Sequence, residues 1–260
     1  MNLISDPNDP GLEEFRSLRT KKKSNTFIAE SEKVCLRLLD SNLKIKSILL
    51  DQNNYKKHLS RISERVPEKN IYVAPGEVLE SIVGYPLHQN LMILTEIPPF
   101  SDLQFDSNHY ILLNGITDPE NLGSIFRSGI AFGFQNFILD KTTSPPYNRR
   151  TVRVSMGNVF QSQLFVPVNV PLVLKEFQFR GFKVLITSPE QRPTLPSICL
   201  KDFVPPEKWV LVLGNEARGV SDELYPFADY SLFLPVRTDS DSINVSHAAS
   251  IFFSHLSILK

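Results

Sequence analysis

The sequence predicts an α/β protein with two domains, of which the second is built on a parallel sheet. Short apolar runs that suit buried strands alternate along the chain with segments of helical periodicity. Two adjacent prolines, Pro98 and Pro99, interrupt this alternation, and proline continues neither a helix nor a central strand. We therefore predict a smaller domain over residues 10–96, a linker over 97–107 and a larger domain over 108–260.

The smaller domain is predicted to have a layered α/β architecture. Apolar residues punctuate charged ones in a mostly helical rhythm over 27–40, and an apolar run at 45–50 suits a strand. The remaining elements are expected as a polar helix at 55–65, a strand at 70–74, a helix at 75–83 that opens with proline, and a buried strand at 91–95.

The larger domain alternates more regularly, which is typical of a parallel sheet with helices on both faces. Its expected strands are 110–113, 137–139, 184–187, 209–213 and 232–236, and its expected helices are 121–132 and 246–259. Ligands of such sheets bind outside the carboxyl ends of the strands. Polar clusters follow three of these strands, so we expect the functional site at that edge.

Composition excludes several classes of protein. The chain of 260 residues has 28 Lys and Arg against 28 Asp and Glu, which excludes attachment to nucleic acid or membrane by bulk charge. Its two cysteines, Cys35 and Cys199, lack a paired-ligand spacing, which argues against a disulfide framework and a structural zinc site. The sequence contains neither a membrane-length apolar run nor a signal-peptide pattern. We predict a cytoplasmic protein without a metal.

Three polar clusters carry the candidate chemistry. The first places Asn121 at the start of a predicted helix and Arg127 about one and a half turns later. The second, residues 214–220, has two glycines that let the backbone approach a ligand closely, but it is neither a P-loop nor a dinucleotide fingerprint. The third, residues 234–249, joins a strand to a capped helix. Each cluster alone also fits an ordinary capped helix or tight turn.

Together and in this order, the clusters resemble the three motifs of the SpoU–TrmH family of RNA ribose 2′-O-methyltransferases, in the SPOUT superfamily. The resemblance covers about residues 108–260, and residues 152–157 resemble the stretch that links the first two motifs. The motif residues are Asn121, Gly123 and Arg127 in the first, Gly214, Glu216 and Gly219 in the second, and Pro235, Ser242, Ile243, Asn244 and Ser246 in the third.

Three positions depart from the family pattern. Ser31 and Asn90 stand where the family commonly has glycine, in the part of the chain that resembles its small substrate-binding domain. Thr238 stands where a glycine commonly follows the proline of the third motif. A β-branched residue there would be strained if the loop required positive φ.

The resemblance implies a trefoil-knotted methyltransferase domain that holds S-adenosylmethionine, preceded by a ribosomal-protein-like RNA-binding domain. It implies cofactor contacts at Leu213, Gly214, Leu234, Ile243 and Val245. It implies catalytic roles for Asn121, Arg127, Glu216, Ser242 and Asn244. Because an arginine keeps its charge at neutral pH, Arg127 is expected to orient the ribose hydroxyl and stabilise the developing alkoxide.

RNA contacts are expected from two groups of cations, which are Lys21, Lys22 and Lys23 in one and Arg149, Arg150 and Arg153 in the other. The resemblance further implies a homodimer, and the added domain favours ribosomal RNA over transfer RNA as the substrate. Two alternatives remain open: a transfer RNA 2′-O-methyltransferase, and a non-catalytic RNA-binding or ribosome-assembly protein of the same fold.

Overall fold

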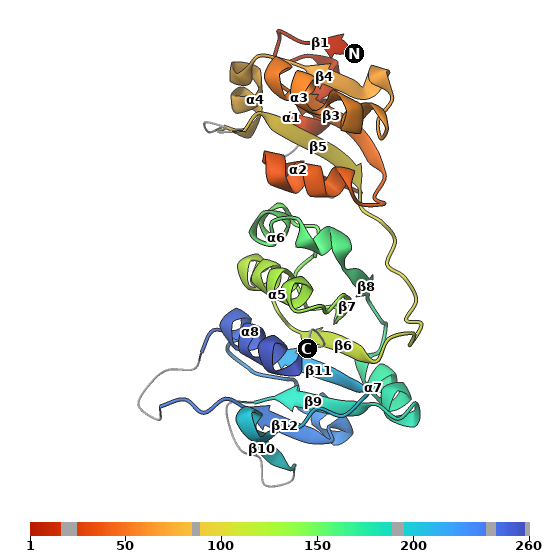
Figure 1. Cartoon of the computed structure of the whole chain (residues 1–260), viewed down its shortest axis with the longest axis vertical. Helices are drawn as coiled ribbons and strands as arrows, with labels where there is room; N and C mark the ends of the chain where they lie inside the picture. Colours follow the sequence, from red (N-terminus) through yellow and green to blue (C-terminus); the bar gives the residue numbers. More distant parts are fainter. Residues whose placement is uncertain (17–24, 85–88, 189–194, 238–242, 258–260) are drawn as a thin grey trace. The chain divides into compact units, whose positions relative to one another are not determined.

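The computed structural model of the chain describes residues 1–16, 25–84, 89–188, 195–237 and 243–257, and it divides into two compact units (Figure 1). Unit 1 comprises Met1–Pro99 and Tyr147–Phe160, and unit 2 comprises Phe100–Pro146 and Gln161–Lys260. The chain therefore enters unit 1 a second time, through a segment that the sequence placed inside the larger domain. Residues 100–107, which were expected to be linker, belong to unit 2.

Unit 1 is built on a five-stranded mixed sheet in the order β1-β4-β3-β5-β2. Its strands are β1 (Asn2–Leu3), β2 (Thr26–Glu30), β3 (Ile45–Leu50), β4 (Ile71–Val73) and β5 (Leu91–Glu96). The strands β1, β4 and β3 are parallel, whereas β5 runs antiparallel to both β3 and β2.

The expected helix over 27–40 is wrong at its start, because residues 26–30 form β2 and pair with β5. Residues 27–30 are all buried. A strand buried on both faces has no two-residue alternation, so periodicity cannot separate it from a helix. The helical part of the segment begins at Glu32.

The helices α1 (Glu13–Arg16) and α4 (Gly76–Val83) share one core of unit 1 with the sheet. Phe15 and Leu79 pack there with the strand residues Leu49 and Met92. This burial of apolar side chains holds α4 against the strands.

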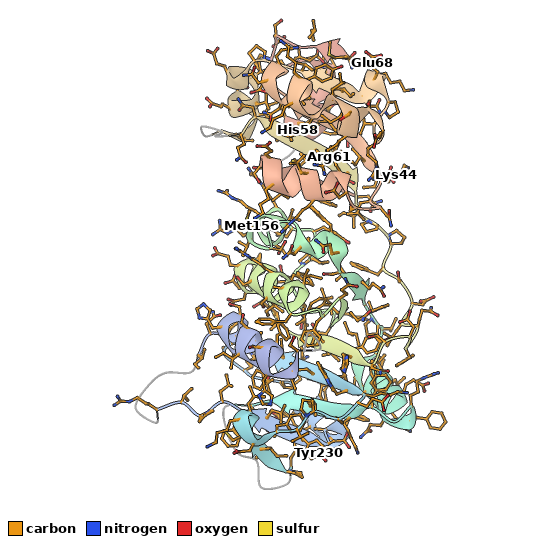
Figure 2. All side chains as sticks on the ribbon, in the orientation of Figure 1. Lys44, His58, Arg61, Glu68, Met156 and Tyr230 are labelled. Carbon is orange, nitrogen blue, oxygen red and sulfur yellow. The ribbon has the colours of Figure 1, made fainter. Side chains whose placement is uncertain are left out.

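The helices α2 (Glu32–Leu39) and α3 (Gln52–Ser63) are joined by ionic contacts. The carboxylate of Glu32 accepts a hydrogen bond from Nζ of Lys57 at 2.5 Å and lies 2.9 Å from Nε2 of His58. One turn further along α3, Arg61 pairs with Asp40 at the end of α2. The spacing of His58 and Arg61, both labelled in Figure 2, places them on the face of α3 that meets α2.

The second segment of unit 1 contributes α6 (Arg149–Val154), which packs against β2. The ring of Tyr147 stacks on Phe27 with 4.9 Å between centroids. The guanidinium of Arg149 donates two hydrogen bonds to the buried carboxylate of Glu30, that from Nη2 at 2.9 Å. The segment is thus held to unit 1 by aromatic stacking and an ion pair.

Unit 2 is built on a seven-stranded sheet in the order β10-β12-β9-β11-β6-β7-β8. Its strands are β6 (His109–Asn114), β7 (Asn136–Leu139), β8 (Gln163–Phe165), β9 (Lys183–Thr187), β10 (Ser197–Cys199), β11 (Trp209–Gly214) and β12 (Tyr230–Phe233). Every pairing is parallel, which confirms the predicted sheet. The edge strands β8 and β10 were not predicted, since neither three-residue strand is a continuous run of buried apolar residues.

The helices of unit 2 are α5 (Pro119–Ala131), α7 (Val170–Phe179) and α8 (Val245–Leu256). α5 packs against α8 and lies close to the sheet at Gly129, where an added Cβ would lie 2.6 Å from Cζ of Phe137. In a separate core, Phe105 packs its ring on Phe177 with 4.8 Å between centroids. Residues 100–107 are therefore anchored to unit 2.

Two further features concern the fold as a whole. No helix in the described ranges has both the length and the apolar character that crossing a bilayer requires. The link between β12 and α8 includes residues 238–242, which lie outside the described residues, so the trefoil knot stays a prediction.

Candidate functional site

A cavity of about 360 Å³ lies in unit 2 at the carboxyl ends of β9, β11 and β12. This volume falls within the range of roughly 300–1,000 Å³ that is usual for small-molecule sites. All the residues for which the resemblance implies cofactor contacts line it, namely Leu213, Gly214, Leu234, Ile243 and Val245. The lining side chains of Val236 and Ile243 remain 42% and 38% exposed, so the cavity offers apolar surface that a ligand could cover.

The wall formed by the second motif is a tight turn that depends on glycine. An added Cβ at Gly214 would lie 2.3 Å from the backbone of Gly219 and Val220, and Gly219 itself has a φ of 70°. The backbone amides of Asn215 and Gly219 each donate to the carbonyl of the other, at 3.0 and 2.8 Å. Glycine is thus required at position 214 because the backbone of residues 219 and 220 approaches it closely. At position 219 it is favoured because the backbone there is left-handed.

A chain of side-chain hydrogen bonds connects the three motifs. Nδ2 of Asn121, at the start of α5, donates to Oε1 of Glu216 at 2.6 Å. Oδ1 of Asn121 accepts from Nδ2 of Asn244 at 2.9 Å. Asn244 also caps α8, because its Oδ1 accepts from the backbone amide of Ser246 at 2.8 Å. Asn121 is only 8% exposed, and both its donor and its acceptor are used.

A second set of contacts holds the ends of the strands around the site. Oδ1 of Asn114, the last residue of β6, accepts from the backbone amide of Ser221 at 2.8 Å. Its Nδ2 donates to Asp140 after β7 at 2.9 Å. Nδ2 of Asn215 donates to the carbonyl oxygen of Gly115 at 2.8 Å. The turns after β6, β7 and β11 are therefore cross-linked at the edge where the cavity opens.

Not every predicted site residue lies at the cavity. Arg127 stands on α5 with its side chain exposed, and it is not among the described residues that line the cavity. Ser242 and the lysines Lys21, Lys22 and Lys23 lie outside the described residues.

The three arginines expected to contact RNA all lie in or beside α6. Arg149 is engaged by Glu30, as described above, whereas the side chains of Arg150 and Arg153 are exposed. The sequence alone does not distinguish the three arginines, because the partner of Arg149 lies 119 positions away along the chain.

Several residues at the cavity were missed. Thr187 and Ser188 line it from the end of β9, and Phe252 lines it from α8. Asn215 and Arg218 lie inside the second motif and also line it. Their place in the motif could have identified Asn215 and Arg218, whereas Thr187 and Ser188 carried only the signal of a strand end.

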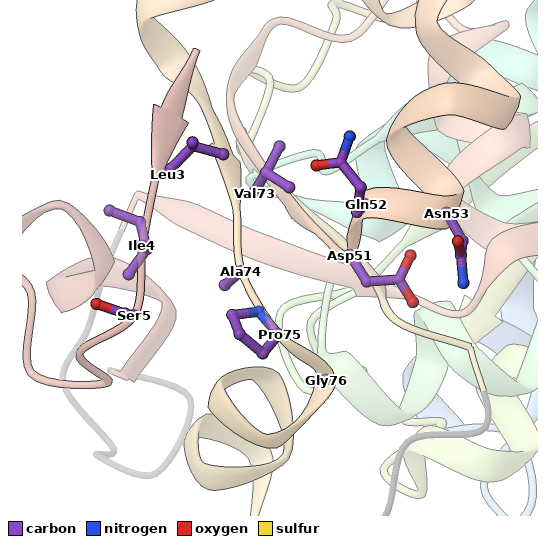
Figure 3. A pocket seen from close by; sticks show the side chains of 10 residues that line it. All are labelled: Leu3, Ile4, Ser5, Asp51, Gln52, Asn53, Val73, Ala74, Pro75 and Gly76. Atoms are coloured by element: carbon purple, nitrogen blue, oxygen red, sulfur yellow. The ribbon is translucent and has the colours of Figure 1, made fainter.

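A larger pocket, of about 530 Å³, lies in unit 1 at the carboxyl ends of β1, β3 and β4 (Figure 3). Leu3 and Val73, which are paired on the neighbouring strands β1 and β4, both line it, and Asp51 marks the start of α3. None of the predicted site residues that the structure describes lines this pocket. All the expected cofactor-contact residues, together with Glu216, line the smaller cavity of unit 2, which is therefore the candidate site.

Comparison with known proteins points to the same region. The sequence profile of the SpoU rRNA Methylase family matches residues 108–254. The chain is 26% identical over 263 residues to the 23S rRNA (guanosine(2553)-2'-O)-methyltransferase RlmP of Bacillus subtilis, covering 98% of this chain and 99% of that protein. It is 32% identical over 141 residues to the 23S rRNA (guanosine-2'-O-)-methyltransferase RlmB of Pseudomonas aeruginosa, covering 54% of this chain and 55% of that protein.

Solved structures share the fold. An AdoMet-bound rRNA methyltransferase from Sinorhizobium meliloti aligns with a TM-score of 0.83 at 24% identity, covering 98% of this chain and 96% of that one. The SpoU methyltransferase AviRb from Streptomyces viridochromogenes, in complex with AdoMet, aligns with a TM-score of 0.77 at 19% identity, covering 95% and 97%. The match over more than half of the chain, which includes all three motifs, confirms the predicted membership: the chain belongs to the SpoU rRNA methylase family.

Proposed function

We propose that this chain is an S-adenosylmethionine-dependent RNA methyltransferase, which transfers a methyl group to a ribose 2′-hydroxyl of structured RNA. The observation that carries the proposal is the hydrogen-bond chain from Asn244 through Asn121 to Glu216, which joins one residue of each motif. Glu216 also lines the cavity. These hydrogen bonds hold the start of α5 and the cavity wall in a fixed relative position. Such a fixed position is needed to align the methyl donor with the ribose hydroxyl.

The lining of the cavity suits S-adenosylmethionine. Leu234, Ile243 and Val245 offer apolar surface for the adenosine part. The turn at Gly214 brings main-chain groups to the wall, and these can hydrogen-bond a nucleoside without titrating. When bound, S-adenosylmethionine supplies a methyl group that its sulfonium makes electrophilic.

Arg127 is the group that we assign to the ribose. Its guanidinium keeps its charge, so it donates hydrogen bonds to the 2′-oxygen and stabilises the negative charge that develops as the proton leaves and the carbon–oxygen bond forms. Preorganised donors of this kind lower a barrier by about 3–4 kcal/mol. Asn121 fixes the start of the same helix through its two hydrogen bonds and so positions Arg127. Glu216, Asn244 and Ser242 complete the polar frame by their motif positions.

We propose ribosomal RNA in the cytoplasm as the substrate, and the 23S rRNA methyltransferase names of the full-length and partial relatives support this choice. Arg150, Arg153 and the lysines at 21–23 are the cations that we assign to phosphates. Phosphate contacts position the RNA, while the reacting ribose has to be accessible in a loop or bulge.

The test is methyl transfer from labelled S-adenosylmethionine to ribosomal and transfer RNA purified from cells that lack the gene. We expect labelling of ribosomal RNA by the unaltered chain and a loss of about 10²–10³-fold in rate for Arg127→Ala, with partial retention in Arg127→Lys. Full activity of Arg127→Ala would refute the role of Arg127. Labelling of transfer RNA alone, or no cofactor binding at all, would instead favour one of the two alternative functions.

We also propose that the chain works as a homodimer. On α8 the residues Ala249, Phe252 and Phe253 are buried within the chain itself, whereas the large apolar side chain of Ile251 is 45% exposed. Membership of the family carries this proposal, and Ile251 is one side chain on α8 that a second copy could cover. Light scattering coupled to gel filtration should give twice the chain mass of 29.5 kDa. A mass of one chain at micromolar concentration would contradict the dimer.

A further inference from the structure

Arg218 occupies a distinctive position in the cavity wall. It lies in the turn between Asn215 and Gly219 and lines the same cavity as the apolar residues assigned to adenosine. Among the described residues, the charged side chains that line this cavity are those of Glu216 and Arg218. The two charged side chains differ in their hydrogen-bond partners.

The carboxylate of Glu216 is occupied by neighbouring amides. It accepts from Asn121 at 2.6 Å and, through its other oxygen, from Asn215 at 3.4 Å. In the parts of the chain that the structure describes, the guanidinium of Arg218 has neither a hydrogen bond nor an ion pair. Among the described residues, the cavity therefore presents a cation that no carboxylate neutralises.

The backbone that carries Arg218 is held in place. Oδ1 of Asn215 accepts from the backbone amides of Ala217 and Arg218, at 3.0 and 3.1 Å. The two backbone hydrogen bonds between Asn215 and Gly219 close the turn, and Nδ2 of Asn215 anchors it to Gly115. The backbone from which the side chain of Arg218 extends is therefore fixed, so that only rotations of the side chain have to be restricted when an anion binds.

We infer that Arg218 binds the carboxylate of the methionine part of S-adenosylmethionine, an inference that rests on the proposed function. The carboxylate is the anionic group of that molecule, and a guanidinium fork matches carboxylate geometry with two parallel hydrogen bonds. Apolar side chains and Arg218 line one cavity, as a ligand with an apolar nucleoside at one end and a carboxylate at the other requires. Arg218 is thus a binding residue for the methyl donor, distinct from Arg127 on α5.

The inference is tested by calorimetry of the full chain with two ligands. S-adenosylhomocysteine carries the carboxylate, whereas 5′-methylthioadenosine keeps the adenosine and lacks the amino-acid part. For Arg218→Gln we expect S-adenosylhomocysteine to bind about tenfold to a hundredfold more weakly, the range for a lost charge-assisted hydrogen bond. We expect 5′-methylthioadenosine to bind unchanged. Arg218→Lys should lie between, because an ammonium retains the charge without the fork.

Lys201→Gln is the matched control, since it removes an exposed cation of unit 2 that does not line the cavity. The inference is overturned if Arg218→Gln weakens both ligands equally, or neither, while the unaltered chain binds S-adenosylhomocysteine. If the variant raises only the KM for RNA, the cation serves a phosphate of the substrate, and the inference again fails. If the unaltered chain binds neither ligand, the proposed function itself fails.

Discussion

At Gly214, a methyl group in place of the α-hydrogen would lie 2.3 Å from the carbonyl carbon of Gly219 and the amide nitrogen of Val220. All these atoms are backbone, so the clash cannot be relieved by a side-chain rotation. Gly219 differs, because an added Cβ there meets nothing within 4 Å and its φ of 70° is the sole obstacle.

We expect Gly214→Ala to abolish measurable S-adenosylhomocysteine binding and to lower the free energy of unfolding by about 2–4 kcal/mol, as overpacking and a displaced turn would. Gly219→Ala should cost only about 1–2 kcal/mol, the strain of a left-handed alanine. Urea unfolding and calorimetry measure both quantities. Equal effects of the two substitutions would contradict the distinction between a clash and a strained backbone.

Ser31 departs from the family pattern, and the structure shows the consequence. The residue has φ 75° and ψ 145°, a region that side chains with a Cβ rarely adopt, and its side chain does not cap α2. The backbone at Ser31 therefore has a conformation typical of glycine, although the residue is a serine.

We expect Ser31→Gly to raise the free energy of unfolding by about 1 kcal/mol, because relief of 1–3 kcal/mol of strain exceeds the entropy that a glycine loses on folding. The measurement is the midpoint of urea unfolding. Ser60→Gly, at an exposed site inside α3, is the control and should lower stability by about 0.5 kcal/mol. A lower midpoint for Ser31→Gly would mean that the serine is not strained.

In the helix α6, tertiary contacts give neighbouring arginines different surroundings. Arg149 and Arg150 are neighbours in the sequence, yet Arg149 pairs with Glu30, whose side chain is only 8% exposed. Removing Arg149 would leave a buried carboxylate without its cation.

We expect Arg149→Met to lower the free energy of unfolding of unit 1 by about 1–3 kcal/mol, less than for a fully buried pair because the side chain of Arg149 is 35% exposed. Arg150→Met, at the exposed neighbouring position, should change it by less than about 0.5 kcal/mol. Denaturant unfolding followed by a probe in unit 1 measures the difference. If the two substitutions had the same effect, the ion pair would contribute nothing to stability.

Apolar runs bounded by turn residues were predictable as strands, whereas the short edge strands, one doubly buried strand and two helices were not. The central strands β6, β9 and β11 follow from their apolar runs. The strand β2 was taken for helix, and α6 and α7 were not expected at all. In α6, three arginines in six residues hide the apolar period, and one of them, Arg149, packs against an ion partner rather than against apolar side chains.

For the whole molecule, the acid response is expected to include a contribution from the start of β6. Burial lowers the pKa of His109 from its ordinary value of about 6.5, and its ring packs on Trp209 with 4.7 Å between centroids. The unfolded chain therefore binds a proton at this histidine at a higher pH than the folded chain does. The free energy of unfolding therefore decreases as the pH falls below about 6.5. Below the pKa that His109 has in the folded chain, this histidine causes no further decrease.

We expect His109→Gln to flatten the dependence of the melting temperature on pH between about 7 and 5, relative to the unaltered chain. His247→Gln, which removes an exposed histidine of α8, is the matched control. Thermal unfolding at a series of pH values makes the comparison. An unchanged slope in His109→Gln would show that another group dominates in this window.

In unit 1, Glu32 also makes the free energy of unfolding depend on pH. Hydrogen bonds from Lys57 and His58 lower the pKa of Glu32 from its ordinary value. A carboxyl group with a lowered folded pKa stabilises the protein above the unfolded value of about 4.5, and this stability is lost as the pH falls further. The contributions of His109 and Glu32 to stability are thus lost below different pH values, about 6.5 and about 4.5.

The local sequence was sufficient for the fold class and the parallel sheet, because apolar period is a property of neighbouring positions. The motif residues were identified through their resemblance to a known family. The meeting of Asn121 with Glu216 and Asn244, which lie 95 and 123 positions further along the chain, depended on the tertiary structure. So did the burial of Glu30 against Arg149 and the exposure of Arg218 to the cavity. Side-chain partners are chosen by the packing of distant strands and helices, and no pattern within a few residues records that packing.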